Sequence, residues 1–226
     1  MFTGYGMSET GPMQVINHLS REEAASDLDT QAQPRTRGGR PAILCDVRIV
    51  DDEVNLLPRD GKSVGEIVFR SPWNTQGYFR NPDSSEALWR GGWMHSSDLG
   101  VMQADGTLRI TDRVKDVIKS GGEWISSLDL ESLSSRHPAV AEVAFIGVPD
   151  ATWGERPMAL IVLRETHRAS CTVEMIREHL LAFAAQGEIP KYAVPERVLF
   201  VEQLEKTSVG KLDKKALRAR YVSNAT

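Results

Sequence analysis

The sequence predicts an α+β protein: a small antiparallel β unit, barrel-like in its short strands and tight turns, followed by a compact α+β domain. Between residues 41 and 111, apolar and polar positions alternate and are separated by turn-forming clusters, as in strands joined as hairpins. After Asp112, strand patterns and helix patterns alternate along the chain. The length of 226 residues suffices for one large domain or two smaller ones.

The β unit follows a polar segment, residues 20–40, which runs into the cluster PRTRGGRP and therefore predicts a loop. In ILCDVRIVDD, residues 43–52, apolar side chains alternate with charged ones, which is the period of a half-buried strand. GEIVFRS predicts another strand, and LPRDGKSVG between the two has turn chemistry. ADGTL, residues 104–108, predicts a further turn, and we expect no helix between residues 41 and 111.

The second half begins with SLDLESLSS, which predicts a short helix with Ser127 as its N-cap. VAEVAFIGVPD and RPMALIVLR each predict a strand. In TVEMIREHLLAFAAQ, apolar residues recur at helical spacing behind Thr172, and VPERVLFVE then returns to a strand pattern. KLDKKALRARYV predicts a final helix, and the change in composition near residues 112–115 predicts a domain boundary.

The composition excludes several classes of protein. Hydrophobic residues make up 41% and charged residues 26%, which is ordinary for a globular chain, and the net charge of -4 argues against nucleic acid as a partner. Cys45 and Cys171 have no CxxC spacing, which predicts a reduced, cytoplasmic setting. The sequence has no apolar run of about 20 residues for a transmembrane segment, and MFTGYGMSETGP lacks the regions of a signal peptide.

The stretch GYGMSETGP invites three interpretations. It approaches the G-x-S-x-G pattern of serine hydrolases, but counting from Gly6 the last position is Thr10. Its glycines and hydroxyls could instead bend the backbone around a phosphate, with Glu9 holding a hard cation through carboxylate oxygen. A turn at the end of a strand is the purely structural alternative.

Two other candidate signatures fail. KTSVGK resembles the end of a phosphate-binding P-loop, but Glu205 stands where the first glycine belongs and Leu212 where Ser or Thr should follow. The histidines show no paired metal spacing, so we expect surface or structural roles and no zinc site. They are His18, His95, His137, His167 and His179.

Four motifs occur together in a characteristic order: GYGMSETGP, GGWMHSSDLG, ITDRVKDVIKSGGEWIS and KTSVGKLDKKALR. In this order and approximate spacing the chain resembles the adenylate-forming acyl-CoA synthetases throughout its length, and KSGGEWISS resembles most the medium- and long-chain fatty acyl-CoA ligases. The resemblance implies that residues 1–111 are the β-rich end of the AMP-binding N-terminal domain, 112–116 a hinge, and 117–226 a mobile C-terminal α+β domain. The Ser/Thr/Gly-rich phosphate loop and most of the N-terminal domain would lie upstream of Met1.

The resemblance also implies a reaction in two steps. A carboxylate attacks the α-phosphate of ATP to give an acyl-adenylate and pyrophosphate, and coenzyme A then displaces AMP. The implied cofactors and partners are ATP, Mg²⁺, coenzyme A and a fatty or other carboxylic acid, and the resemblance admits a homo-oligomer. Because the phosphate loop is missing, we expect the 226-residue chain alone to be inactive.

Positions in the motifs carry the implied roles. The nucleotide-binding residues would be Gly4, Tyr5, Ser8, Asp98 and Arg113. Glu9 would hold magnesium, and Lys211 would be the catalytic residue that brings positive charge to the phosphoryl transition state. Two positions depart from the family pattern: Ser8 replaces the commoner threonine but keeps the hydroxyl, and Ser97 stands where glycine is usual.

The stretch DRVKDVIKSGGEWISS would contain the hinge, with a charged strand crossing it and Lys115 as the hinge residue. Gly121, Gly122 and Trp153 would line the path of coenzyme A, because glycines let backbone approach a thin chain without a Cβ clash. For Trp124 a place in the core is an equal alternative.

Other functions remain open at this stage. The chain could be a catalytically silent domain that binds a nucleotide or a partner, or an adenylation domain for another carboxylic acid. A peptide-synthetase domain is disfavoured because no carrier domain with its attachment serine follows. The acid's chain length cannot be deduced, because its pocket would be built mostly from the upstream segment.

Overall fold

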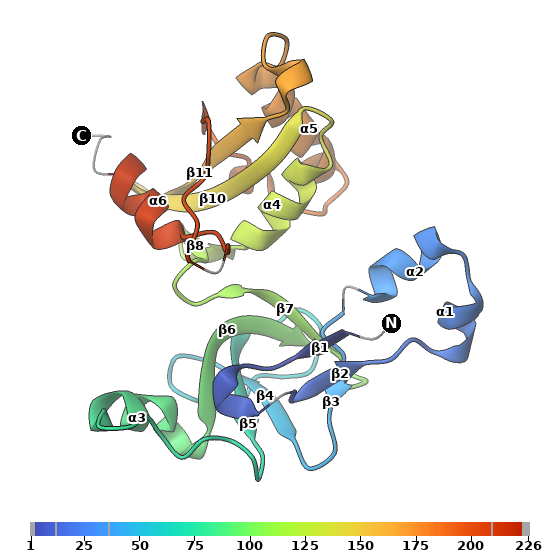
Figure 1. The fold of residues 1–226 in the computed structure, drawn as a ribbon, viewed down its shortest axis with the longest axis vertical. Coiled ribbons are helices and arrows are strands. Elements are labelled where there is room, and N and C mark those ends of the chain that lie inside the picture. Colours follow the sequence, from blue (N-terminus) through green and yellow to red (C-terminus); the bar gives the residue numbers. More distant parts are fainter. Residues whose placement is uncertain (1–2, 12, 36, 209, 223–226) are drawn as a thin grey trace. The chain divides into compact units, whose positions relative to one another are not determined.

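The computed structural model describes residues 3–11, 13–35, 37–208 and 210–222, and the chain divides into two compact units, Met1–Val114 and Lys115–Thr226 (Figure 1). The division falls inside the segment 112–116, where we place the hinge. Motion at this point remains a prediction. Within the described ranges, no helix has the length and apolar character needed to cross a membrane.

The first unit contains two antiparallel sheets (Figure 1). The smaller sheet has the order β1-β2-β3 and is formed by Thr3–Tyr5, Val15–Asn17 and Arg40–Pro41. The larger sheet has the order β4-β5-β6-β7 and is formed by Asp46–Val50, Gly65–Arg70, Met94–Met102 and Leu108–Arg113. This confirms the antiparallel β unit. Among the described residues, the larger sheet is open, with β4 and β7 at its edges, and does not close into a barrel.

Three short helices in this unit were not expected. α1 (Arg21–Ala25) begins with a capping box in which the Ser20 and Glu23 side chains bond each other's backbone N–H, and α2 (Leu28–Arg35) follows. α3 (Pro82–Leu88) begins where the Asn81 side chain accepts from the Ser84 N–H. The expectation of no helix between residues 41 and 111 is therefore wrong. α2 and β3 also shorten the expected loop at PRTRGGRP from both ends.

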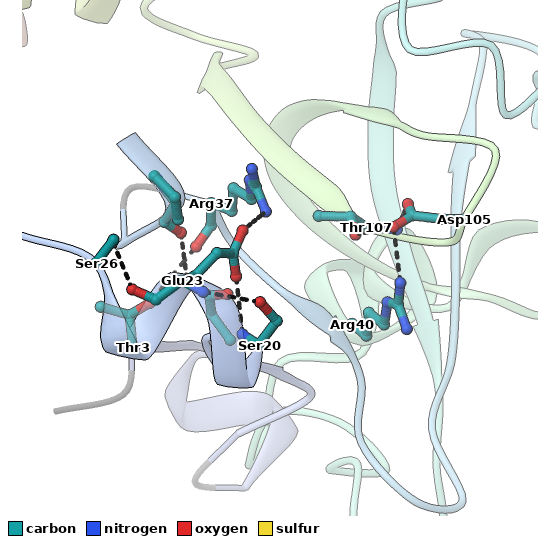
Figure 2. A network of polar contacts seen from close by, with 10 residues as sticks. Thr3, Ser20, Glu23, Ser26, Arg37, Arg40, Asp105 and Thr107 are labelled. Carbon is teal, nitrogen blue, oxygen red and sulfur yellow. Dashed lines mark hydrogen bonds and ion pairs between the residues drawn. The ribbon is translucent and has the colours of Figure 1, made fainter. Parts of the chain in front are cut away.

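One ion pair joins Arg37 to α1, and another joins β3 to the turn between β6 and β7 (Figure 2). Arg37 Nη1 lies 2.9 Å from Glu23 Oε1 of α1, and Arg40 Nη2 lies 2.8 Å from Asp105 Oδ2 in the turn between β6 and β7. Asp105 also accepts the Thr107 N–H at 2.9 Å, so the turn expected at ADGTL is confirmed.

The second unit is a five-stranded sheet with helices on both faces. Four strands follow the order β10-β11-β8-β9, and β12 runs parallel to β11. The strands are β8 (Ile118–Ser120), β9 (Glu123–Ile125), β10 (Val140–Asp150), β11 (Gly154–Leu163) and β12 (Arg197–Phe200). The helices are α4 (Ser127–Ser135), α5 (Val173–Ala185) and α6 (Lys214–Tyr221).

Alternate residues of β10 enter two different cores. Phe145 joins the core formed with α4 and α5, whereas Ile146 joins the core formed with α6 through Leu217. Both residues are fully buried, so this strand is apolar on both faces. The expected strands and helices of this half are confirmed. The N-cap of α4 is Ser126 rather than Ser127, because the Ser126 hydroxyl accepts the Asp129 N–H at 3.0 Å.

The segment between β7 and β8 differs from the expected charged strand. Residues 114–117 form a turn, and Lys115 is exposed in it. The Lys115 carbonyl accepts a hydrogen bond of 3.0 Å from Arg218 Nη2 of α6, and the same nitrogen lies 2.8 Å from Asp116 Oδ1. Lys115 and Asp116 are thus tied to the last helix of the second unit.

Candidate active site

Tyr5, Asp98 and Arg113 meet in the first unit. Tyr5 ends β1, and Asp98 and Arg113 are opposite each other on β6 and β7. The Tyr5 hydroxyl donates to Asp98 Oδ2 at 2.6 Å, and Arg113 Nε lies 3.3 Å from Asp98 Oδ1. Burial and then the nearby Asp98 carboxylate raise the pKa of Tyr5 above its usual value. The Asp98 carboxylate is therefore fixed from both oxygens while remaining an acceptor-only group.

Strand β6 is irregular just before Asp98, where its register with β5 shifts as in a β-bulge. Ser97 has φ of 60°, in the left-handed region, and its N–H donates to Glu66 Oε1 at 2.9 Å. Glu66 Oε2 lies 2.8 Å from Nδ1 of His95, whose Nε2 lies 3.0 Å from the Arg90 carbonyl oxygen. Burial would raise the pKa of Glu66, but the hydrogen bonds from His95 and the Ser97 N–H lower it below its usual value. The left-handed φ explains why glycine suits this position.

The segment Ser8–Thr10 forms a short 3-10 turn. Thr10 is fully buried, and its Oγ1 accepts the Met7 N–H at 2.9 Å, whereas Ser8 is exposed. The Glu9 carbonyl accepts the Thr75 N–H at 2.7 Å, and Glu9 Oε1 accepts the Tyr78 hydroxyl at 2.8 Å. The turn is thus held by its backbone and by Thr10, which leaves Ser8 on the surface. Pro12, the last residue of GYGMSETGP, lies outside the described residues.

An open cavity of about 390 Å³ lies between Met7, just before this turn, and the part of β6 that precedes Asp98. Met7 and Tyr78 line it together with His95, Ser96 and Ser97. Residues of two motifs that are far apart in the sequence therefore share one cavity.

Glu9 fits a magnesium ion only as part of a larger donor set. Among the residues that the structure describes, no group of three or more His, Cys, Asp or Glu side chains could hold a metal. Mg²⁺ in nucleotide sites commonly uses one or two carboxylates together with substrate phosphates and water. A single carboxylate such as Glu9, oriented by Tyr78, matches that usage.

Gly4 lies in β1 opposite Ile16. A Cβ at this position would lie 2.3 Å from Met13 Sδ, so a side chain there would displace the methionine. The structure therefore gives Gly4 a packing role beside Tyr5.

Lys211 lies on an exposed loop of the second unit, just before α6. Lys206 and Leu212 form an isolated β-bridge that closes the loop, and the Thr207 N–H donates to the Lys211 carbonyl oxygen at 2.7 Å. The Lys211 N–H donates to Thr207 Oγ1 at 3.2 Å. The backbone of Lys211 is thus fixed while its side chain faces solvent. Val209 of KTSVGK lies outside the described residues.

The structure brings Gly121 and Trp153 together. The Gly121 N–H donates to the Trp153 carbonyl oxygen at 2.8 Å, and a Cβ on Gly121 would lie 2.9 Å from Trp153 Cε3. Gly121 and Gly122 have φ of 61° and 82°, so both positions favour glycine. Trp153 is 52% exposed, whereas Trp124 is half-buried with Lys119 Nζ 5.8 Å from its ring centroid. Gly121 and Trp153 therefore form one surface.

The first unit is β-rich and holds an anchored carboxylate, and the second is an α+β unit with an exposed lysine loop. Comparison with known families assigns the class. Residues 1–79 match the family model described as "AMP-binding enzyme", and residues 129–211 match "AMP-binding enzyme C-terminal domain". The chain belongs to this family of adenylate-forming enzymes.

Curated relatives and solved structures agree with this assignment. The chain is 37% identical over 219 residues to "Long-chain-fatty-acid--CoA ligase" of Thermus thermophilus, covering 96% of this chain and 39% of the relative. It is 38% identical over 217 residues to "3-methylmercaptopropionyl-CoA ligase" of Ruegeria pomeroyi, with coverage of 96% and 39%. The solved o-succinylbenzoate CoA synthetase (MenE) of Bacillus subtilis, in complex with its acyl-adenylate intermediate, has a TM-score of 0.79 and 28% identity over 96% of this chain and 40% of its own. The chain thus spans about two fifths of the proteins it matches.

Proposed function

We propose that this chain is the C-terminal part of an AMP-forming acid–thiol ligase that acts on a fatty acid. The carboxylate oxygen attacks the α-phosphorus of ATP and the bond to pyrophosphate breaks; the thiol of coenzyme A then attacks the acyl carbon and AMP leaves. The Asp98 carboxylate, held by Tyr5 and Arg113, carries the proposal, because a fixed acceptor suits the two hydroxyls of a ribose.

The other nucleotide roles in the same unit are those that the family resemblance implies. The Tyr5 ring would contact the adenine, with Gly4 beside it, and the Ser8 hydroxyl would contact the α-phosphate. Glu9 would hold Mg²⁺, which neutralises phosphate charge when bound. The exposure of Ser8 and the orientation of Glu9 by Tyr78 support these roles.

Lys211 would supply positive charge to the phosphoryl transition state of the first step. Its exposed side chain on a fixed backbone supports that role, because a long flexible cation can enter and leave a site. Gly121, Gly122 and Trp153 would contact coenzyme A in the second step, with Lys115 as the hinge between the two states.

The acid itself is the least specified part. The likeness of KSGGEWISS to fatty acyl-CoA ligases and the long-chain ligase among the relatives support a fatty acid. The relative named for 3-methylmercaptopropionyl-CoA favours a second candidate, the same reaction with another carboxylic acid. Comparing turnover with a long-chain fatty acid and a short carboxylic acid separates the two.

The reaction would take place in the reducing cytoplasm. Both cysteines are free, which supports this setting. Fractionation of cells that express the chain, with detection outside the cytoplasmic fraction as the contrary result, tests it.

Lys211→Ala in the ligase that contains this chain tests the proposal. We expect pyrophosphate release to fall about 100-fold or more, and thioester formation from a preformed acyl-adenylate to change little. Lys215→Ala, at an exposed position four residues later, is the matched control. Equal losses in both steps would remove the role of Lys211.

The 226-residue chain alone should make no acyl-CoA, because it spans only about two fifths of the relatives' length. Acyl-CoA formed by the purified chain would contradict this. If the longer protein that contains this chain binds AMP but activates no acid, the alternative of a catalytically silent binding domain is favoured.

A further inference from the structure

His95 is a buried ring that links Glu66 to the backbone of Arg90. The residue is 7% exposed, and each ring nitrogen faces an acceptor: Nδ1 lies 2.8 Å from Glu66 Oε2, and Nε2 lies 3.0 Å from the Arg90 carbonyl oxygen. The ring therefore fixes one carboxylate oxygen of Glu66, so the two side chains form one unit.

The second oxygen of Glu66 acts on the backbone. Oε1 accepts the Ser97 N–H at 2.9 Å, and Ser97 holds φ of 60°, which is disfavoured for a residue with a Cβ. The Ser97 carbonyl accepts the Val114 N–H at 3.0 Å, so both the N–H and the carbonyl of Ser97 are hydrogen-bonded. The direction in which the Asp98 side chain leaves the strand depends on this conformation.

We propose that Glu66 and His95 are positioning residues that hold Ser97 in its left-handed conformation and thereby aim the Asp98 carboxylate at its ligand. The ligand, the ribose of a nucleotide, rests on the proposed function; the positioning itself does not. Neither residue has to touch the nucleotide, since both act through the Ser97 backbone. The Glu66 carboxylate stabilises the positive φ at Ser97, whereas glycine would adopt that φ without support.

Glu66→Gln tests the proposal first in the 226-residue chain. The amide places an NH₂ group against one of the two N–H donors, so the backbone at Ser97 should relax and the hydrogen bond from Tyr5 to Asp98 should weaken. We expect the ¹³Cζ NMR resonance of the Tyr5 ring, recorded near neutral pH, to shift because the Tyr5 hydroxyl loses its acceptor. Asp46→Asn removes a half-exposed ion pair with Arg48 in the same sheet and is the control.

The decisive arm is a rescue. Glycine adopts a positive φ without a Cβ penalty, so Ser97→Gly added to Glu66→Gln should restore the Tyr5 ¹³Cζ resonance. In the ligase containing this chain, Glu66→Gln should raise the KM for ATP about tenfold, with the thioester step little changed, and the double variant should recover. His95→Gln, which removes the imidazole ring but keeps Glu66, should show a smaller change of the same kind and serves if Glu66→Gln fails to fold.

The outcomes separate the two proposals. An unchanged Tyr5 ¹³Cζ resonance in folded Glu66→Gln or His95→Gln, or a change that Ser97→Gly does not restore, overturns the positioning role. A resonance that shifts and is rescued while the KM for ATP stays constant supports the positioning role and argues against ribose binding by Asp98.

Discussion

Ser97 has φ of 60° although it has a Cβ atom, so its backbone conformation is strained. A left-handed conformation costs a residue with a Cβ about 1 to 2 kcal/mol, which glycine avoids. Glycine in turn lowers the free energy of unfolding by about 0.5 to 1 kcal/mol, because it gives the unfolded chain more conformational freedom. We expect Ser97→Gly to stabilise the first unit by about 0.5 kcal/mol. Urea unfolding of the 226-residue chain measures it. Ser97→Ala keeps the Cβ and should give no gain, so an alanine variant more stable than the glycine variant would refute the strain.

At the residue scale, the motifs predict which residues belong to the candidate site but not which of them are in contact. Tyr5 and Asp98 are 93 positions apart, and no periodicity relates them, so only the family resemblance could pair them. The Glu66–His95 pair was missed because its members are 29 positions apart and belong to no shared pattern. The serine at position 97, where the family usually has glycine, could have indicated the pair. A residue with a Cβ at a position of positive φ needs a stabilising contact such as the bond from the Ser97 N–H to Glu66.

At the element scale, α6 is fastened to α4 by a buried cation. Lys214 is 7% exposed, and its Nζ lies 2.7 Å from Glu131 Oε1 and 2.6 Å from Ser127 Oγ. Lys214→Met leaves the Glu131 carboxylate buried without its cation, and we expect a loss of about 3 to 5 kcal/mol in unfolding free energy. Lys206→Met, at the half-exposed pair with Glu142, should cost at most about 1 kcal/mol.

Charge burial predicts a further result for this pair. Glu131 also accepts the Phe145 N–H at 2.8 Å, and glutamine can keep that bond. Adding Glu131→Gln to Lys214→Met should therefore recover part of the loss, and additive losses in urea unfolding would contradict the assignment.

A second contact between elements depends on pH. His137, just after α4, accepts the Ala139 N–H on Nδ1 at 3.2 Å and packs edge-on against His179 of α5 at 5.1 Å. Burial, followed by the charges of His179 and His167, lowers the pKa of His137 below its ordinary value of 6.5. The folded state therefore favours the neutral ring, so this stability is present above pH 6.5 and is lost as pH falls through the folded pKa. Arg136, over the Phe183 ring, adds positive charge nearby.

We accordingly expect the urea midpoint to fall between pH 7 and pH 5, about the unperturbed histidine range. His137→Asn should fall less, because the amide oxygen can still accept the Ala139 N–H and has no proton to gain. Identical pH dependence in both proteins would show that other groups cause the loss.

Long elements could be predicted from the sequence and short ones could not. β10 and α5 have eleven and thirteen residues, so their periodicities are visible. α3 has seven residues and buries only Leu88, so it has no amphipathic pattern to detect. Its start was nevertheless encoded, since Asn81 followed by Pro82 is a common helix beginning.

At the scale of the whole molecule, the two units meet in sequence at Val114 and Lys115. The sequence places a change of composition close to this point, between Asp112 and Lys115. A change of orientation between the units could not be derived from the sequence alone, since it requires two states and each pattern describes one. Whether Lys115 is a hinge is therefore a question for kinetics.

Lys115→Pro answers it in the ligase that contains this chain. Proline fixes φ near about -65° and removes the backbone N–H, so a boundary that must change conformation would be held in one state. Under the hinge proposal, one half-reaction survives and the other collapses, because a rigid boundary cannot serve both Lys211 and the Gly121–Gly122 segment.

Lys115→Ala removes only the charge of an exposed side chain and should leave both steps nearly intact. Pyrophosphate release and thioester formation from preformed adenylate are measured separately, together with thermal unfolding. If proline instead lowers both rates in parallel with stability, Lys115 is an ordinary turn residue whose carbonyl bond to Arg218 matters only for folding.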